Sequence, residues 1–221
     1  MSDSRTVPAH EGRAEVRERA SRFLAFVSPA ATPEEARASL ARLKKEYHDA
    51  THVAFAWKIG SGASTRERAS DAGEPSGTAG KPIAAAIASA GVTDVVVAVV
   101  RYFGGTKLGT GGLSRAYRRA AEAAIAAAAR KTVRETVLVI VTCPYERLGS
   151  ARRLLRLPGV TLAAETFEPD PVLRLEVLQS RLPGLLTDLD KARLPYEILR
   201  PARPGDSLGV HPASAARPAS R

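Results

Sequence analysis

The stretch RYFGGTKLGTGGLSRAY, residues 101–117, decides the fold that we predict for the first half of the chain. It follows the apolar run DVVVAVVRY (94–102), which is typical of a central strand covered on both faces, and it leads into an alanine-rich helix expected to end near Arg130. Glycine in this density costs backbone entropy on folding, roughly 0.5–1 kcal/mol per residue relative to alanine. The order strand, glycine turn, helix start predicts a concavity lined by backbone N–H groups, which favours a bound anion.

The residues of this loop that we expect to bind an anion are glycines, cations and one serine. Its spacing excludes two common nucleotide motifs, because it contains no Gly-Lys-Ser/Thr sequence and Ser114 stands where a dinucleotide fingerprint requires glycine or alanine. Arg115, Arg118 and Arg119 share one helix face with Glu122, so the positive charge is one-sided. The alternative is a tight strand-to-helix corner, capped by Gly112 or Ser114, beside a solvated arginine face. The predicted anion-binding residues are Arg101, Gly104, Gly105, Lys107, Gly109, Gly111, Gly112, Ser114 and Arg115.

A second loop, GSGASTRERASDAGEPSGTAG (60–80), precedes a helix expected over residues 82–90. A loop of this length inside a compact domain is more often functional than ordinary. Its two central carboxylates have the chemistry for acid–base work or for holding a cation, and they are also suited to pairing with the cations of the first loop across a shared cleft. We favour pairing, or fixing of the loop itself. The residues predicted to form this second wall of the cleft are Asp71, Glu74, Ser76, Gly77, Thr78, Gly80 and Lys81.

The remaining sequence predicts two domains. In the first, SRFLAFVS (21–28) and THVAFAWKIG (51–60) alternate as strands do, and Thr32 begins a helix that runs to about Tyr47. The second shows strands and helices in the order βαββα with a closing strand, which suggests a ferredoxin-like module. Its strands are expected at 136–143, 160–167, 172–178 and 196–200, and its helices at 145–157 and 181–192. The predicted organisation is a loose N-terminus (1–20), a first domain (21–133), a ferredoxin-like domain (134–200) and a disordered tail (201–221).

The composition is that of a basic globular protein. Hydrophobic residues make up 44% and charged residues 25% of the 221 residues, and 33 Lys and Arg against 23 Asp and Glu give a net charge of +10. Such a charge favours nucleic acid or phosphate as a partner, unless the arginines are merely solvated. The single cysteine, Cys143, excludes a disulfide within the chain, and no apolar run approaches the roughly 18–20 residues that span a bilayer. We therefore expect a cytosolic protein without a metal, a cofactor or a membrane partner.

The two loops together, DAGEPSGTAGKP (71–82) and VVRYFGGTKLGTGGLSRAY (99–117), closely resemble the signature of the Impact family, whose bacterial branch is called YigZ. The resemblance extends back through SRFLAF (21–26) and ATHVAFAWKIG (50–60), and it covers the layout of the whole chain. It implies an α+β protein whose first domain has the ribosomal protein S5 domain 2-like fold. The second domain would be ferredoxin-like, an α/β plait similar to the C-terminal domain of elongation factor G.

The resemblance also bears on function. The family is generally regarded as non-enzymatic, and its eukaryotic members bind a ribosome-associated activator of a translation-control kinase. Many members carry polar residues and a cysteine after the histidine that corresponds to His52, where this chain has Val53 and Ala54. A catalytic or metal-binding role for that strand is therefore disfavoured, and His52 is kept only as a residue expected to face the cleft.

Three hypotheses for the function follow. The first is a non-enzymatic protein of translation regulation or stress response that binds RNA, the ribosome or a phosphate-bearing ligand through the basic, glycine-lined cleft. The second is a small-molecule enzyme, because GGLSRAY (111–117) loosely resembles the phosphate loop of kinases that share the S5-like fold. Asp71 or Glu74 would then act as a base or a magnesium ligand. The third is a module that docks an acidic protein partner, such as one of the translation system. The sequence favours the first hypothesis.

Overall fold

Two compact units make up the described part of the chain, and both are mixed α/β. The computed structural model describes residues 3–167 and 169–199, so the predicted tail (201–221) lies outside the described residues. The first unit spans Arg5–Val133, and the second begins at Arg134 and also takes in Asp3 and Ser4.

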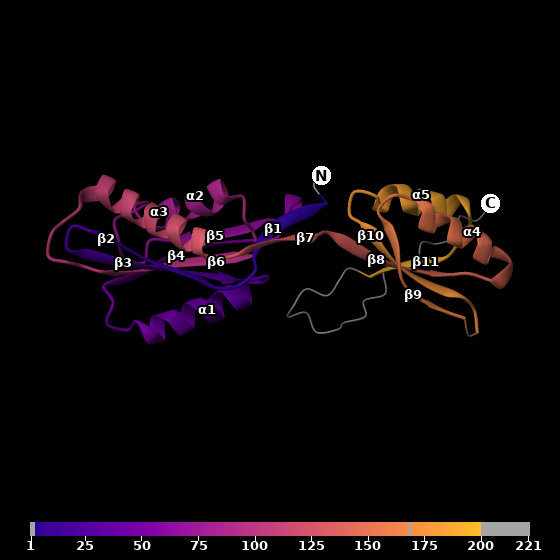
Figure 1. Cartoon of the computed structure of the whole chain (residues 1–221), viewed down its shortest axis with the longest axis horizontal. Helices are drawn as coiled ribbons and strands as arrows, with labels where there is room; N and C mark the ends of the chain where they lie inside the picture. The colour runs from indigo at the N-terminus through magenta and orange to yellow at the C-terminus, as the bar shows by residue number, and fades with distance from the viewer. Residues whose placement is uncertain (1–2, 168, 200–221) are drawn as a thin grey trace. The chain divides into compact units, whose positions relative to one another are not determined.

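A five-stranded antiparallel sheet forms the centre of the first unit (Figure 1). All residues from Val95 to Arg101, in the middle strand, are buried, because helices cover both faces of the sheet. The run of valines correctly predicts this central strand. From one edge to the other, the order of strands is β2 (Gly12–Glu18), β3 (Ser21–Pro29), β6 (Val95–Tyr102), β4 (His52–Ile59) and β5 (Arg66–Ser70).

Helices cover this sheet on both sides (Figure 1). α1 (Pro33–Glu46) lies on one face, whereas α2 (Gly80–Ala90) and α3 (Gly109–Ala127) lie together on the other. The predicted start of α1 is confirmed: the Thr32 hydroxyl accepts the backbone N–H of Glu35 at 3.2 Å, and the Glu35 carboxylate accepts a backbone N–H in return. The larger of the two cores lies between the sheet and the pair α2 and α3.

The N-terminal segment is not loose, and the prediction for residues 1–20 is wrong. β1 (Ser4–Pro8) pairs with β7 (Arg130–Arg134), and β2 pairs along its whole length with β3. The two apolar residues of β2, Ala14 and Val16, pack against the larger core. Sequence analysis missed both strands because their few apolar residues stand among charges, and because long-range pairing and packing stabilise them more than local propensity does.

The two glycine-containing loops also differ from their prediction. The segment 60–80 holds a short 3₁₀ turn, η1 (Gly62–Ser64), and the edge strand β5, which is too exposed to show an apolar pattern. α3 begins at Gly109, ahead of both predicted caps, Gly112 and Ser114. Those two residues lie within the first turns of the helix, since neither has the positive φ that would interrupt it.

The second unit contains a four-stranded antiparallel sheet with helices on one face (Figure 1). Every strand and helix expected after residue 134 is present, although the first helical segment is divided into 3₁₀ and α-helical parts. The strand order is β11 (Tyr196–Leu199), β8 (Thr136–Thr142), β10 (Val172–Leu178) and β9 (Val160–Thr166). The helical segments are η2 (Tyr145–Arg147), α4 (Leu148–Arg153), η3 (Leu154–Arg156) and α5 (Leu182–Lys191).

Candidate functional site

Four polar side chains from distant segments of the first unit meet near the end of β6, and we call them the Glu74 cluster: His52, Glu74, Arg101 and Tyr117. The Nη1 atom of Arg101 donates to both carboxylate oxygens of Glu74, at 2.7 and 2.9 Å. The Tyr117 hydroxyl donates to Oε1 of the same carboxylate at 2.7 Å. His52 approaches this oxygen less closely, with its Nε2 at 4.0 Å. The expected pairing of the second loop with a cation of the first is therefore confirmed for Glu74 and Arg101.

Strand pairing places two members of the Glu74 cluster side by side, and α3 adds a third. His52 lies opposite Arg101 in the β4–β6 ladder, and Phe23 lies opposite Arg101 in the β3–β6 ladder. Tyr117 comes from the buried face of α3, where its ring packs edge-on against Phe23 with the two centroids 5.1 Å apart. Three neighbouring strands and one helix thus hold Arg101 from both sides.

The turn before α2 places Glu74. Gly73 has a φ of +91°, which L side chains rarely adopt, and a Cβ at this position would lie 3.2 Å from the His52 ring. The His52 Nδ1–H donates to the Ala72 carbonyl at 2.9 Å and so ties the turn to β4. Glycine is required here both by the backbone conformation and by the imidazole packed against it.

The ion pair in the Glu74 cluster has lost almost all contact with water. The side chains of Arg101 and Glu74 are 6% and 2% exposed. Desolvation offsets most of the attraction in such a pair, so it contributes to positioning more than to net stability. Burial, and then the hydrogen bond to Glu74, raise the pKa of Tyr117 far above its ordinary value. Tyr117 therefore stays protonated and remains a hydrogen-bond donor to Glu74.

Asp71, the other carboxylate of the second loop, fixes the loop and the start of α2. Its Oδ2 accepts the backbone N–H of Gly77 at 2.8 Å, and its Oδ1 accepts those of Ala79 and Gly80 at 2.9 and 2.8 Å. Burial alone raises the pKa of the Asp71 carboxyl, but these three hydrogen bonds outweigh it and hold the pKa below its ordinary value. The N-terminus of α2 is thus already capped by Asp71.

Asp71→Ala is expected to lower the free energy of unfolding at pH 7 by about 2 kcal/mol, because three backbone donors lose a charged acceptor. Since the folded pKa is depressed, this stabilisation is present above the unfolded pKa of about 3.9 and is lost as pH falls through the folded value. Urea unfolding at pH 7 and pH 2.5 should therefore show a smaller difference between variant and parent at the lower pH. The exposed Asp49→Ala serves as the control, and an equal loss at both pH values would contradict the assigned role.

Two of the arginines predicted to form a one-sided basic face are paired with carboxylates. Arg118 donates to Glu122 at 2.8 Å, and Arg119 donates to Glu18 at 3.2 Å. The predicted face is therefore partly neutralised, because the turn of the β2–β3 hairpin supplies an acidic residue that helix spacing does not reveal. Within the part of the chain that the structure describes, Arg115 forms no ion pair, and its guanidinium folds back toward the first turn of α3.

The glycine loop packs on the turn between β2 and β3. A Cβ on Gly104 would lie 2.1 Å from the Ala20 backbone, so only glycine fits there. Arg19, in the same turn, donates to the Lys107 carbonyl at 3.3 Å. Both of these cations are exposed, and the N-cap of α3, Leu108, makes no side-chain hydrogen bond to the helix start. We call the three exposed cations beside this helix start the α3 rim: Arg19, Lys107 and Arg115.

The other predicted site residues shape the two loops or lie at the surface. Gly105 and Gly109 have φ values of +82° and +69°, and they turn the chain into α3. Thr78 is buried, and its hydroxyl donates to the Pro75 carbonyl at 2.7 Å. Gly80 is buried, and a Cβ there would lie 2.8 Å from the Ser70 backbone nitrogen. The remaining ones include a glycine of positive φ in the second loop and exposed or half-buried positions: Gly77, Ser76, Lys81, Gly111, Gly112 and Ser114. Three of the residues predicted from the two loops and from β4 meet one another: Glu74 forms an ion pair with Arg101, and His52 lies near the same carboxylate.

Comparison with known proteins places the two glycine-containing loops inside a sequence family. Residues 19–125 match the Impact N-terminal domain. An "IMPACT family member in pol 5'region" from Thermus thermophilus is 43% identical over 179 residues, which are 79% of this chain and 96% of that protein. The chain belongs to the IMPACT family.

Other members of the IMPACT family and one solved structure extend this similarity over most of the chain. An "IMPACT family member" from Haemophilus influenzae is 31% identical over 81% of this chain and 89% of its own length. A solved structure described as "Crystal structure of an hypothetical protein" has a TM-score of 0.64 and 28% identity, and it covers 90% of this chain and 98% of its own. The relationship therefore includes residues of both units.

Sequence analysis of this IMPACT protein missed three residues of interest. Tyr117 lies two turns into α3. Its sequence position indicates an ordinary core residue, and only the structure shows that its hydroxyl donates a hydrogen bond to Glu74. Phe103 follows β6 and places its ring 5.4 Å from the Arg101 guanidinium carbon. Arg19 fell in the segment expected to be loose. The signal for Tyr117 and Phe103 is their place in the family signature, RYFGGTKLGTGGLSRAY (101–117), whereas Arg19 carries no local signal.

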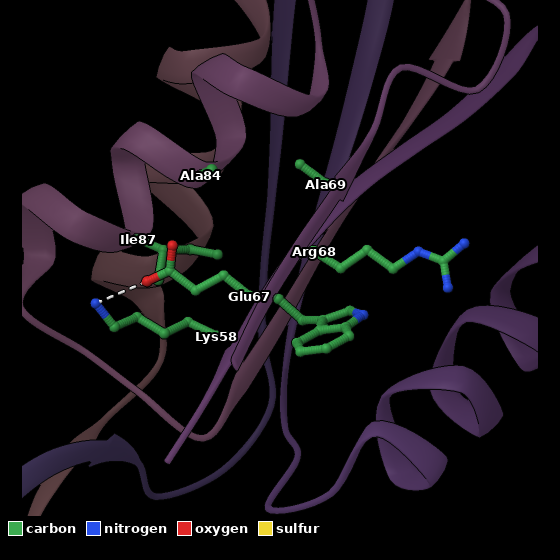
Figure 2. Close-up of a pocket in the computed structure, with 7 residues that line it drawn as sticks. Lys58, Glu67, Arg68, Ala69, Ala84 and Ile87 are labelled. Atoms are coloured by element: carbon green, nitrogen blue, oxygen red, sulfur yellow. Dashed lines mark ion pairs between the residues drawn. The ribbon is translucent and has the colours of Figure 1, made fainter. Parts of the chain in front are cut away.

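A hollow of about 160 Å³ lies elsewhere on the first unit, along the β4–β5 edge of the sheet and beside α2 (Figure 2). Figure 2 shows Ala84 and Ile87 on the α2 side and Arg68 extending away from them, while Lys58 and Glu67 form an ion pair at 3.0 Å. None of the predicted site residues lines this hollow. The loops that identify the IMPACT family therefore do not form it.

Both central carboxylates of the second IMPACT loop are already engaged by other groups of the first unit. The kinase-like hypothesis needs Asp71 or Glu74 as a base or a magnesium ligand, yet Asp71 accepts three backbone N–H groups and Glu74 is held by Arg101 and Tyr117. Among the described residues, no group of three or more His, Cys, Asp or Glu side chains is arranged to hold a metal ion. The helices of that same part of the chain are too short or too polar to cross a membrane.

Proposed function

We propose that this protein is a non-enzymatic, cytosolic RNA-binding protein of translation regulation or the stress response, and that it contacts the RNA backbone through the α3 rim. The observation that carries this proposal is the exposure of Arg19, Lys107 and Arg115 beside a helix start that no side chain caps. The first backbone N–H groups of a helix and its dipole favour negative charge at this end. Cations placed there add the Coulombic attraction that dominates binding to a nucleic-acid backbone.

The interactions of Glu74 and Asp71 limit which residues are available to contact phosphates. The charge of Arg101 is already matched by Glu74 in a nearly water-free site, so Arg101 contributes little to the long-range attraction of phosphates. The N-terminus of α2 is likewise occupied by Asp71. The proposal therefore assigns the backbone contacts to the start of α3 and its rim, and it gives the second loop the task of holding β4 and α2 in place.

Membership of the IMPACT family is the support for a role in translation. Eukaryotic members bind a ribosome-associated activator of a translation-control kinase, and this makes the ribosome or its RNA the partner that we propose. We also propose that the first unit has the ribosomal protein S5 domain 2-like fold. For the second unit we propose the ferredoxin-like plait of the elongation factor G C-terminal domain. The strand order β11-β8-β10-β9 and the element order βαββαβ support this second assignment.

Binding of labelled single-stranded RNA, measured by fluorescence anisotropy over a range of salt, tests the role of the α3 rim. We expect the logarithm of the binding constant to fall with the logarithm of salt concentration by about 0.7 for each phosphate contacted. Lys107→Glu and Arg115→Glu should each weaken binding about tenfold and reduce this slope by about 0.7, the value of one phosphate contact. Sedimentation of tagged protein through a ribosome profile, with and without Arg115→Glu, checks the same prediction for the ribosome.

Charge reversal on the opposite face of the sheet provides the matched control. Lys44 and Lys45 lie in the last turn of α1, across the sheet from α3 (Figure 1). Lys44→Glu and Lys45→Glu change the net charge by the same amount and should leave RNA affinity nearly unchanged. Equal losses in the two sets of variants, or no association with RNA or ribosomes at low salt, would contradict the proposal. Protein partners that remain bound after nuclease treatment would instead favour docking of an acidic protein.

A further inference from the structure

One edge of the buried Arg101 guanidinium has no partner. Its Nη1 atom is used by Glu74, and among the described residues Glu74 is the one hydrogen-bond partner of this side chain. The Nε atom is buried and makes no hydrogen bond. Glu74 does not swing across to satisfy it, because Tyr117 holds the carboxylate from the other side at 2.7 Å. A buried, unpaired donor on a charged group is costly, so this edge is suited to a ligand that supplies the missing acceptors.

The geometry of the guanidinium group determines which arrangement of acceptor atoms the ligand must have. In an arginine side chain, the Nε–H and one Nη2–H point the same way, side by side, and together they bind two acceptor atoms that lie next to each other in one plane. Carboxylates, phosphates and the O6 and N7 atoms of guanine all present such a pair. The unpaired Nε of Arg101 thus calls for a bidentate acceptor rather than for a single carbonyl group.

Charge distinguishes among these acceptors. Glu74 already matches the charge of Arg101, and its side chain is 2% exposed. An anion seated on the free edge would leave a net negative charge close to the Glu74 carboxylate, in a site with little water to screen it. Guanine offers two acceptors without a charge, so it completes the hydrogen bonds of Arg101 without that repulsion.

The aromatic rings around Arg101 fit the same ligand. The guanidinium carbon lies 5.6 Å from the centroid of Phe23 and 5.4 Å from that of Phe103. Phe23 is fully buried, whereas Phe103 is 46% exposed and has its backbone N–H tied to Thr51 at 3.0 Å. The Phe103 ring is therefore the solvent-exposed cover of the site. A base bound to Arg101 would therefore find the exposed Phe103 ring, rather than Phe23, available for stacking.

We infer that the free Nε/Nη2 edge of Arg101 binds the O6 and N7 atoms of one unpaired guanine in a bound RNA, with Phe103 as the ring on which that base stacks. This inference rests on the proposed function, since it assigns the α3 rim to the phosphate backbone and Arg101 to one base. Backbone contacts position the strand, and the base contact gives the protein a sequence preference.

A series of uridine-rich RNA strands with one variable central base tests this inference. We expect guanine to bind about tenfold more tightly than uracil. Inosine, which keeps O6 and N7, should bind as guanine does. Replacement by 7-deazaguanine, which lacks N7, or by adenine, which presents a donor in place of O6, should lose the preference. Arg101→Lys should abolish the preference, Phe103→Ala should weaken it, and Lys44→Arg, an exposed position on α1, should leave it intact.

Because Arg101→Lys leaves Glu74 partly unpaired and can unfold the domain, the parent protein supplies an independent measurement. The ¹H–¹⁵N signal of Arg101 Nε–H should shift in a saturable way with guanosine 5′-monophosphate, and it should not respond to uridine 5′-monophosphate or to inorganic phosphate. A shift caused by inorganic phosphate alone, or a preference for cytosine, would overturn the assignment to guanine. Equal binding of all bases would overturn this inference while the proposed function stood. Absence of RNA binding together with an unshifted Arg101 signal would overturn both.

Discussion

Glu74→Ala is expected to lower the free energy of unfolding of the first unit by about 3–5 kcal/mol, a large share of the roughly 5–15 kcal/mol that stabilises a typical domain. The variant leaves the guanidinium of Arg101, 6% exposed in the parent, without its carboxylate. It also leaves the buried Tyr117 hydroxyl without its acceptor. Urea unfolding followed by tryptophan fluorescence measures this loss directly, because Trp57 is the single tryptophan of the chain and lies in β4.

Two further variants test whether the loss of stability in Glu74→Ala comes from breaking a buried ion pair or from losing any carboxylate. Glu122→Ala removes an exposed partner of Arg118 and should cost less than about 0.5 kcal/mol. The double variant Glu74→Leu with Arg101→Met replaces both charges by apolar groups of similar size, and it should recover much of the stability lost in Glu74→Ala. A loss of less than about 1 kcal/mol in Glu74→Ala, or no recovery in the double variant, would show that the pair is not buried as the structure has it.

Phe23→Ala is expected to cost a further large amount, about 3–5 kcal/mol, through the cavity that it opens beneath Arg101. The Phe23 ring is 0% exposed and packs edge-on against Tyr117. Removing the ring therefore deletes apolar contacts and loosens the residues that hold Glu74. The same urea experiment measures the change in the free energy of unfolding.

Phe103→Ala is the matched control, since it removes the same kind of side chain at a similar distance from the same guanidinium. Its ring is 46% exposed, so the variant should change the free energy of unfolding by less than about 1 kcal/mol. A comparable loss in the two variants would contradict the view that Phe23 is part of the core and Phe103 a cover.

Much of the fold could be predicted from local patterns. The run of valines in β6 and the capping box at Thr32 each depend on residues within a few positions of one another. The strands and helices after residue 134 follow equally clear alternation and helical periodicity. The strands β1 and β2 could not be found in this way, because their stabilisation comes from pairing with β7 and β3 and from packing on the core.

The candidate site, like the fold, was predicted only in part from the sequence. The sequence by itself determined which two loops carry the family signature and that a carboxylate of one would meet a cation of the other, because the residue types and the signature are local information. Only the tertiary structure decided that Glu74 takes Arg101 and Tyr117, that Asp71 caps α2, and that one edge of Arg101 is left over. The reason is physical: a hydrogen bond between segments 27 or 43 residues apart is selected by burial. In a site without water each polar atom requires a partner, and only the packed chain determines which one it meets.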